Sequence, residues 1–202
     1  MKDFESVSSS EFIDELKRKN LEGRRAMVAE LRKRSSDKAV SILVDLLSDE
    51  SWYLRELAVE ALGEIGSKSA PQLRRLLAGG LWYTRAASAR AIGRMGYEPV
   101  IPDLVELLDD PNHTVQGACF ASLAEMVSRG HTRQVARALW DRGQRRAEEL
   151  KRLMLAVQPE AGEKVAEMLK DPASLLARHG ALKLESKDDF EDPGHEVEVK
   201  GA

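Results

Sequence analysis

Histidine and cysteine are the residue types in this 202-residue chain that would most directly indicate catalysis or metal binding. No two of the histidines have the spacing of metal ligands on one helix or turn; they are His113, His131, His179 and His195. The single cysteine, Cys119, cannot form an intrachain disulfide, and its place among small residues is typical of an inert buried thiol. The sequence also lacks P-loop, G-x-S-x-G and dinucleotide-binding glycine motifs. We therefore expect no catalytic residue, no metal site and no bound cofactor.

Aromatic pairs one period of the sequence apart, Trp52-Tyr53 and Trp82-Tyr83, suggest instead that the chain binds another molecule. On a helix, Tyr53, Glu56 and Glu60 would share one face. Shifting this face along the chain by successive periods gives three equivalent sets: Tyr83, Ala86 and Arg90; Thr114, Gly117 and Ala121; and Arg145, Glu148 and Arg152.

Placed side by side, these sets predict a partner-binding groove. Its aromatic wall would be Trp52, Tyr53, Trp82 and Tyr83, its low floor Ala86, Gly117 and Ala121, and its charged groups Glu56, Arg90, Arg145 and Arg152. Such a groove suits a peptide or helix that carries both apolar and acidic groups. The alternative is that the tryptophans only cover the edge of the stack and that the arginines form a solvated helix face.

The residues of this groove must be positioned by a structure that repeats, and the sequence contains such a repeat. Residues 54–66 recur as residues 84–96 and, less closely, as residues 115–126. Each copy follows an amphipathic stretch with leucines at i, i+3 and i+4. A unit of about 30 residues with two apolar faces cannot bury both by itself, so neighbouring units must stack. The pattern predicts an all-α fold, an α-solenoid of helix pairs.

Small residues, glycines and prolines mark the limits of these helices. Small side chains recur where a second helix must approach the next repeat closely, at Ala58, Ala61, Ser88, Ala91, Cys119 and Ser122. Gly66 and Gly96 are expected to end helices, and Pro71, Pro99 and Pro102 to lie near the start of the next ones. We expect a frayed N-terminus over residues 1–9, a solenoid over residues 10–184 and an acidic flexible tail over residues 185–202.

Residues 49–66 and 110–126 resemble HEAT repeats, particularly the short bacterial and archaeal type named after phycobilisome lyases. The resemblance rests on a Leu-Leu-x-Asp end of a first helix, a Leu/Thr-Arg pair opening the second and an Ala-Leu-Gly-Glu-Ile-Gly close. It implies an armadillo/HEAT-type superhelix of about five to six helix pairs, with second helices on the concave side. It also implies an Asp–Arg ladder between repeats, interrupted where Gly79 and Gln116 depart from the pattern; its members would be Asp49, Arg55, Arg85 and Asp110.

Three functions are consistent with such repeats. The leading hypothesis is a non-catalytic scaffold or adaptor that binds a protein partner in the concave groove. The alternatives are an accessory subunit resembling the phycobilin lyases, which hold a chromophore and its acceptor protein, and nucleic-acid binding like that of HEAT-type DNA glycosylases. The net charge of −3 argues against nucleic acid. Because the sequence has no apolar leader and no run of 18 apolar residues, we expect neither secretion nor a membrane partner. The single cysteine fits a reducing cytosol, and the composition suits a bacterium or archaeon, so we expect a cytoplasmic protein.

The acidic tail suggests a further hypothesis about charge. Residues 129–146 are rich in arginine, whereas the sequence from Glu185 onward is strongly acidic. The tail would then fold back over this basic surface and compete with the partner. The alternative is a free tail that increases solubility.

Overall fold

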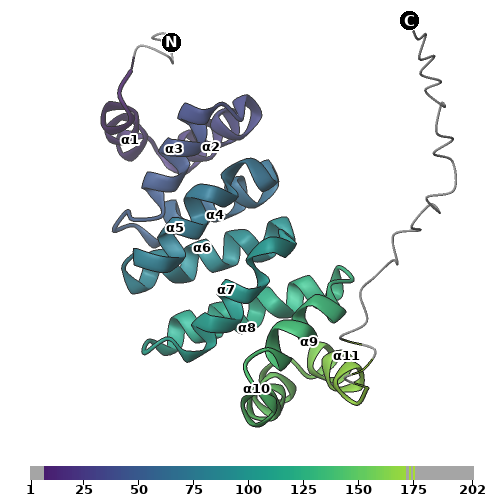
Figure 1. Cartoon of the computed structure of the whole chain (residues 1–202). Helices are drawn as coiled ribbons and strands as arrows, with labels where there is room; N and C mark the ends of the chain where they lie inside the picture. The colour runs from purple at the N-terminus through teal and green to yellow at the C-terminus, as the bar shows by residue number, and fades with distance from the viewer. Residues whose placement is uncertain (1–6, 172, 174, 176–202) are drawn as a thin grey trace, which may run out of the picture.

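The computed structural model describes residues 7–171, 173 and 175, which form helices stacked from α1 at one end to α10 and α11 at the other (Figure 1). The helices are α1 (Ser9–Arg18), α2 (Leu21–Arg34), α3 (Asp37–Leu46), α4 (Trp52–Ile65), α5 (Ala70–Gly79), α6 (Trp82–Met95), α7 (Ile101–Glu106), α8 (His113–Ser128), α9 (Thr132–Trp140), α10 (Gln144–Val157) and α11 (Pro159–Leu169). Short 3-10 turns join some of them: η2 (Gly66–Ser69), η3 (Glu98–Val100) and η4 (Leu107–Asp109). The all-α solenoid expected from the sequence is confirmed.

Local chemistry explains where the helices start and stop. The side chains of Ser51 and Asn112 accept hydrogen bonds from the first-turn amides of α4 and α8. Gly66 and Gly96 end α4 and α6 with φ of 79° and 66°, a conformation that costs glycine little. Pro71 lies in the first turn of α5, where its missing amide hydrogen is not needed.

The second helix of each pair packs beside the second helix of the next, so that α2, α4, α6 and α8 form one continuous layer. The most extensive packing within this layer is between α6 and α8, where Gly93 faces Ser122. The Ser122 hydroxyl donates to the Ala89 carbonyl across this interface at 2.8 Å. The small residues at these positions are buried, as the repeat pattern predicts: Ala58, Ala61, Ser88, Ala91, Cys119 and Ser122.

The layer of second helices ends at α8, because α10 does not continue it. α10 packs against α9 and α11, whereas α11 lies against α8 as well as α9. Gly162 of α11 allows this arrangement, because a Cβ there would lie 2.7 Å from the backbone of Leu155 in α10. The expected alignment of Arg145 and Arg152 with the earlier second helices is therefore not met.

The described residues include only part of each of the first two expected segments and none of the third. The helix α1 begins at Ser9, one residue before the expected start of the solenoid. The end of the last repeat, the proposed tail at residues 185–202 and its fold-back over the basic surface lie outside the described residues.

Candidate partner-binding surface

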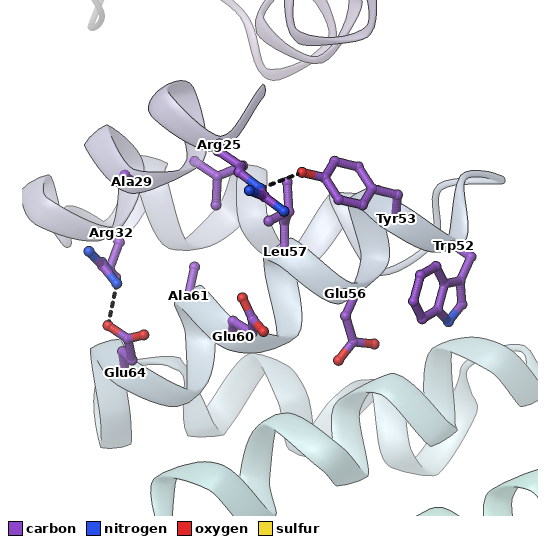
Figure 2. Close-up of a pocket in the computed structure, with 11 residues that line it drawn as sticks. Arg25, Ala29, Arg32, Trp52, Tyr53, Glu56, Leu57, Glu60, Ala61 and Glu64 are labelled. Carbon is purple, nitrogen blue, oxygen red and sulfur yellow. Dashed lines mark hydrogen bonds and ion pairs between the residues drawn. The ribbon is translucent and has the colours of Figure 1, made fainter. Parts of the chain in front are cut away.

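The second helices line two adjoining hollows on one face of the stack. The first, of about 530 Å³, lies between α2 and α4 (Figure 2) and is lined by Arg25, Val28, Ala29, Arg32, Trp52, Tyr53, Glu56, Leu57, Glu60, Ala61 and Glu64. The second, of about 660 Å³, lies across α4, α6 and α8 and shares three glutamates of α4 with the first. The two hollows share these glutamates and together form a groove along the second helices.

Most of the charged side chains that line this groove are paired with one another. The Arg90 guanidinium of α6 donates to Glu56 of α4 at 2.6 Å. On the other side of α4, Arg32 of α2 is bound to Glu64, as Figure 2 shows. Arginine on both flanking helices therefore neutralises the carboxylates of α4. Arg90 was expected to offer a basic group to a partner, but in the folded chain its charge is already matched by Glu56.

Exposed apolar side chains lie at the start of successive second helices, and one of them, Trp52, also lines the groove. Leu21, Trp52 and Trp82 are the first residues of α2, α4 and α6, and Leu81 immediately precedes α6. Their exposed fractions are 61%, 63%, 46% and 61% for Leu21, Trp52, Trp82 and Leu81. We call these four residues the apolar rim. The tryptophans were predicted from their spacing, whereas the two leucines were missed; their place beside the same helix starts is the signal that would have found them.

The two tyrosines behind the rim are half-buried and held by neighbours. The Tyr53 hydroxyl accepts a hydrogen bond from Arg25 Nε at 2.8 Å (Figure 2). The Tyr83 ring meets the Trp82 ring edge to face, with centroids 5.5 Å apart. These contacts fix the orientation of both rings, so that the tryptophans rather than the tyrosines present most of the aromatic surface.

The expected floor of the groove is only partly accessible. Ala86 is 5% exposed because α6 is covered by α4 on one side and α8 on the other. Gly117 and Ala121 of α8 are exposed, as is Thr114. Arg145 and Arg152 are exposed on α10, away from this layer. The structure thus brings together the expected residues of α4, α6 and α8 but not those of α10.

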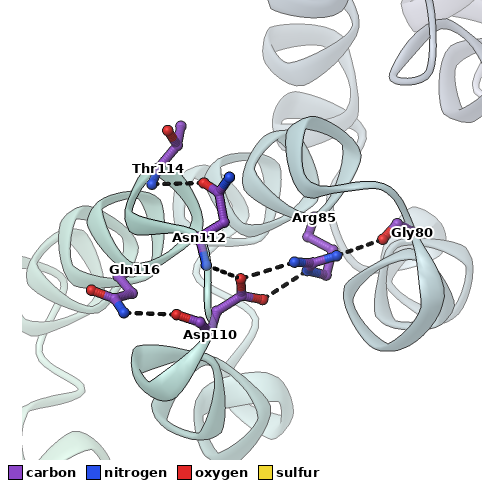
Figure 3. A network of polar contacts seen from close by, with 6 residues as sticks. All are labelled: Gly80, Arg85, Asp110, Asn112, Thr114 and Gln116. Atoms are coloured by element: carbon purple, nitrogen blue, oxygen red, sulfur yellow. Dashed lines mark hydrogen bonds and ion pairs between the residues drawn. The ribbon is translucent and has the colours of Figure 1, made fainter.

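The Asp–Arg ladder is complete at the junction between α6 and α8 (Figure 3). Arg85 donates through Nε and Nη2 to both carboxylate oxygens of Asp110, each at 2.8 Å, and through Nη1 to the Gly80 carbonyl at 2.7 Å. The backbone N–H of Asn112 also donates to the Asp110 carboxylate, at 2.8 Å. Burial opposes the charged carboxylate, but the hydrogen bonds from Arg85 and Asn112 outweigh it and lower the Asp110 pKa. Gln116, where arginine was expected, binds the Asp110 carbonyl.

The earlier rungs of the ladder are different. Asp49 pairs with Lys17 of the first repeat, at 2.7 Å. Arg55 donates through Nη1 to the carbonyls of Asp49 and Glu50, at 2.6 and 2.9 Å, rather than to a carboxylate of the next repeat. Its guanidinium lies over the Tyr83 ring, 5.3 Å from the centroid. The departure at Gly79 therefore leaves Arg55 on an aromatic face.

Residues that could react or bind metal do not gather in this groove. Burial raises the pKa of the Cys119 thiol to about 12, with a smaller contribution from Asp110. Within residues 7–171, 173 and 175, no group of three or more His, Cys, Asp or Glu side chains is placed to hold a metal ion. In the same part of the chain, no helix is both long and apolar enough to cross a bilayer.

Comparison with known proteins assigns the repeats to a family. The chain matches the model of HEAT repeats over residues 9–82 and 71–157, and it therefore belongs to the HEAT-repeat family. It is similar to the complex of CpcE and CpcF of phycocyanin lyase from Nostoc sp. PCC7120, with 20% identity, a TM-score of 0.44 and coverage of 83% of this chain and 67% of that one. It is also similar to an engineered protein, with 15% identity, a TM-score of 0.39 and coverage of 83% and 97%. No curated protein matches the chain.

Proposed function

We propose that this HEAT-repeat chain is a non-catalytic scaffold that binds a protein partner along the apolar rim and the adjoining groove. The observation that carries the proposal is the apolar rim itself: Leu21, Trp52, Leu81 and Trp82 are large apolar side chains, each at least 46% exposed, at equivalent places in three successive repeats. Tryptophans that are held by a rigid helix and left in water are typical anchors of protein interfaces. A solenoid presents such anchors at regular intervals, which suits an elongated partner segment.

The charge pattern of the groove favours protein over nucleic acid. A surface that binds phosphate backbones needs cations whose charge is not already matched. Here Arg32 and Arg90 are paired with carboxylates of α4, and the chain as a whole carries a net charge of −3. A groove in which most arginines are paired with glutamates, beside exposed apolar side chains, matches the mixed polar and apolar surface of a protein segment.

A pull-down experiment tests the proposal. The wild-type chain and a Trp52→Ala, Trp82→Ala variant are used as baits in a lysate of the source organism, and Leu153→Ala serves as a control because Leu153 is an exposed apolar residue on α10. We expect a protein that is recovered by the wild type and the control but not by the rim variant. Removing a tryptophan anchor typically costs at least about 2 kcal/mol, or roughly a thirtyfold loss of affinity. Recovery of the same proteins by all three baits would refute the proposal.

A further inference from the structure

Asp49, Gly79 and Asp110 occupy equivalent places between a first and a second helix, two residues before the N-cap of the second helix; Gly79 is also the last residue of α5. In the turn before α4, Asp49 accepts the Ser51 amide at 2.9 Å. In the turn before α8, Asp110 accepts the equivalent amide in the same way. Each of these carboxylates also receives a cation from the preceding repeat. The turn before α6 has Gly79 at this place, so the chain itself provides no carboxylate there.

The cation that would meet a carboxylate at this turn is Arg55. It corresponds to Arg85 of the next repeat, and both use Nη1 to bind carbonyls of their own turn. Arg85 then uses Nε and Nη2 to hold Asp110. Across the described part of the chain, no carboxylate forms an ion pair with Arg55, and its Nε and Nη2 have no hydrogen-bond acceptor. Two parallel donors of the kind that bind a carboxylate are therefore unused.

The space beside Gly79, where the missing carboxylate would lie, is open. A Cβ added at Gly79 would meet no atom within 4 Å. The turn is followed directly by Leu81 and Trp82 of the apolar rim, which are 61% and 46% exposed. The Tyr83 ring supports the guanidinium from one side, at 5.3 Å. An unmatched arginine and an exposed apolar pair thus lie next to each other.

We propose that this turn binds an Asp or Glu side chain of the protein partner, with an adjacent apolar residue of the partner resting on Leu81 and Trp82. This inference rests on the proposed scaffold function and names the chemistry that the rim recognises. The carboxylate takes the place that Asp49 and Asp110 fill in the neighbouring turns, and it accepts the two unused N–H groups of Arg55. The precedent is within the molecule, since Arg85 holds Asp110 in this manner with both N–O distances at 2.8 Å.

The first test restores the carboxylate within the chain. In Gly79→Asp, the new side chain is expected to pair with Arg55 and raise the melting temperature by about 2–4 °C, the shift that corresponds to about 1 kcal/mol in a chain of this size. Gly79→Asn, which has the same shape without the charge, controls for the change in the backbone. The gain should vanish when Arg55→Gln is combined with Gly79→Asp. Equal effects of Asp and Asn, or a gain that persists without Arg55, would overturn the proposal.

The second test measures recognition directly with a library of blocked, C-terminally amidated peptides in which an Asp, Asn, Glu or Gln lies beside Leu, Phe or Trp. Blocking the ends removes terminal carboxylates, so any acidic preference comes from a side chain. The wild type should prefer Asp or Glu by about tenfold, the equivalent of one charge-assisted pair of about 1.4 kcal/mol. The preference should be lost in Arg55→Gln and in Gly79→Asp but kept in Arg152→Gln, which removes an exposed arginine of α10.

The outcomes separate this inference from the proposed function. Peptides that bind through Trp52 and Trp82 without an acidic preference would overturn the inference and leave the scaffold function intact. An acidic preference that survives Arg55→Gln would also overturn it, because the peptide carboxylate would then bind to another residue. If no peptide binds, the inference falls, whereas the scaffold function is decided by the pull-down with the rim variant.

Discussion

Replacing Gly93 by alanine should weaken the stack where α6 packs most extensively on α8. Gly93 lies within α6 and faces α8, and a Cβ at this position would lie 2.8 Å from both the Cα and the Cβ of Ser122. Real Cβ atoms do not approach backbone carbon so closely. Because the Ser122 Cα cannot rotate away, α6 and α8 must separate to accept the methyl group. The separation would also lengthen the 2.8 Å hydrogen bond from Ser122 to the Ala89 carbonyl.

The size of the effect follows from two opposing contributions. Adding a methylene-sized group to a tightly packed interface costs about 1–3 kcal/mol. The upper part of this range applies here, because the obstructing atom belongs to the backbone. Alanine has a higher helix propensity than glycine, which offsets about 1 kcal/mol. We therefore expect Gly93→Ala to lower the free energy of unfolding by about 2 kcal/mol and the melting temperature by about 4–8 °C.

Gly117→Ala in α8 is the matched control. Gly117 is exposed, and a Cβ there would meet no atom within 4 Å, so only the gain in helix propensity remains. This variant should be more stable than the wild type by about 1 kcal/mol. Both variants are compared by thermal unfolding followed by far-ultraviolet circular dichroism. A Gly93→Ala variant as stable as Gly117→Ala would show that α6 and α8 are not in close contact at this point and would refute the reasoning.

Three further predictions concern individual side chains. Asp110→Asn should destabilise the chain by about 2–4 kcal/mol, because it leaves Arg85 without its partner. The Asp110 pKa is lower in the folded chain than in the unfolded one, so its contribution to stability is complete above about pH 5 and is lost as the pH falls through the folded-state pKa. In urea unfolding between pH 7 and pH 3, the free energy of unfolding should therefore decline less for the variant than for the wild type. An equal decline for both proteins would contradict this assignment. A double-mutant cycle of Glu56→Gln and Arg90→Gln should give a coupling of about 0.5–1 kcal/mol, because the pair is partly exposed, whereas zero coupling would leave Arg90 available to a partner. Cys119, buried and with its pKa raised to about 12, should react with a thiol reagent only after denaturation, and prompt reaction in the native chain would contradict its burial.

The repeat pattern in the sequence was sufficient to predict the stack and most of its helix limits. Leucines at helical spacing in every copy, and a glycine at the end of the first two copies, specify helix pairs. Gly66 and Gly96 end helices for a reason that depends on the backbone alone. The rim tryptophans were also predictable, because they repeat with the same period as the core.

Contacts between repeats could not be read from the period. Arg90 was aligned with Glu60, its equivalent one period earlier, but it binds Glu56, which lies one helical turn before Glu60. Pairing between stacked helices depends on their offset, which a comparison of equivalent positions does not provide. The departure of α10 likewise depends on the tight packing of Gly162 against Leu155. A glycine within a helix was visible in the sequence, but its partner was not.

Between the α5–α6 and α7–α8 pairs, the first helices pack less closely than the second helices. α6 and α8 are in close contact along the second-helix layer, whereas α5 and α7 have few close backbone approaches and are joined by the Arg74–Asp103 ion pair at 3.0 Å. An exposed ion pair contributes less than about 1 kcal/mol and is weakened by salt. At this junction we therefore expect α5 and α7 to separate more easily than α6 and α8. Their separation should cost less free energy as ionic strength rises, because salt screens the ion pair.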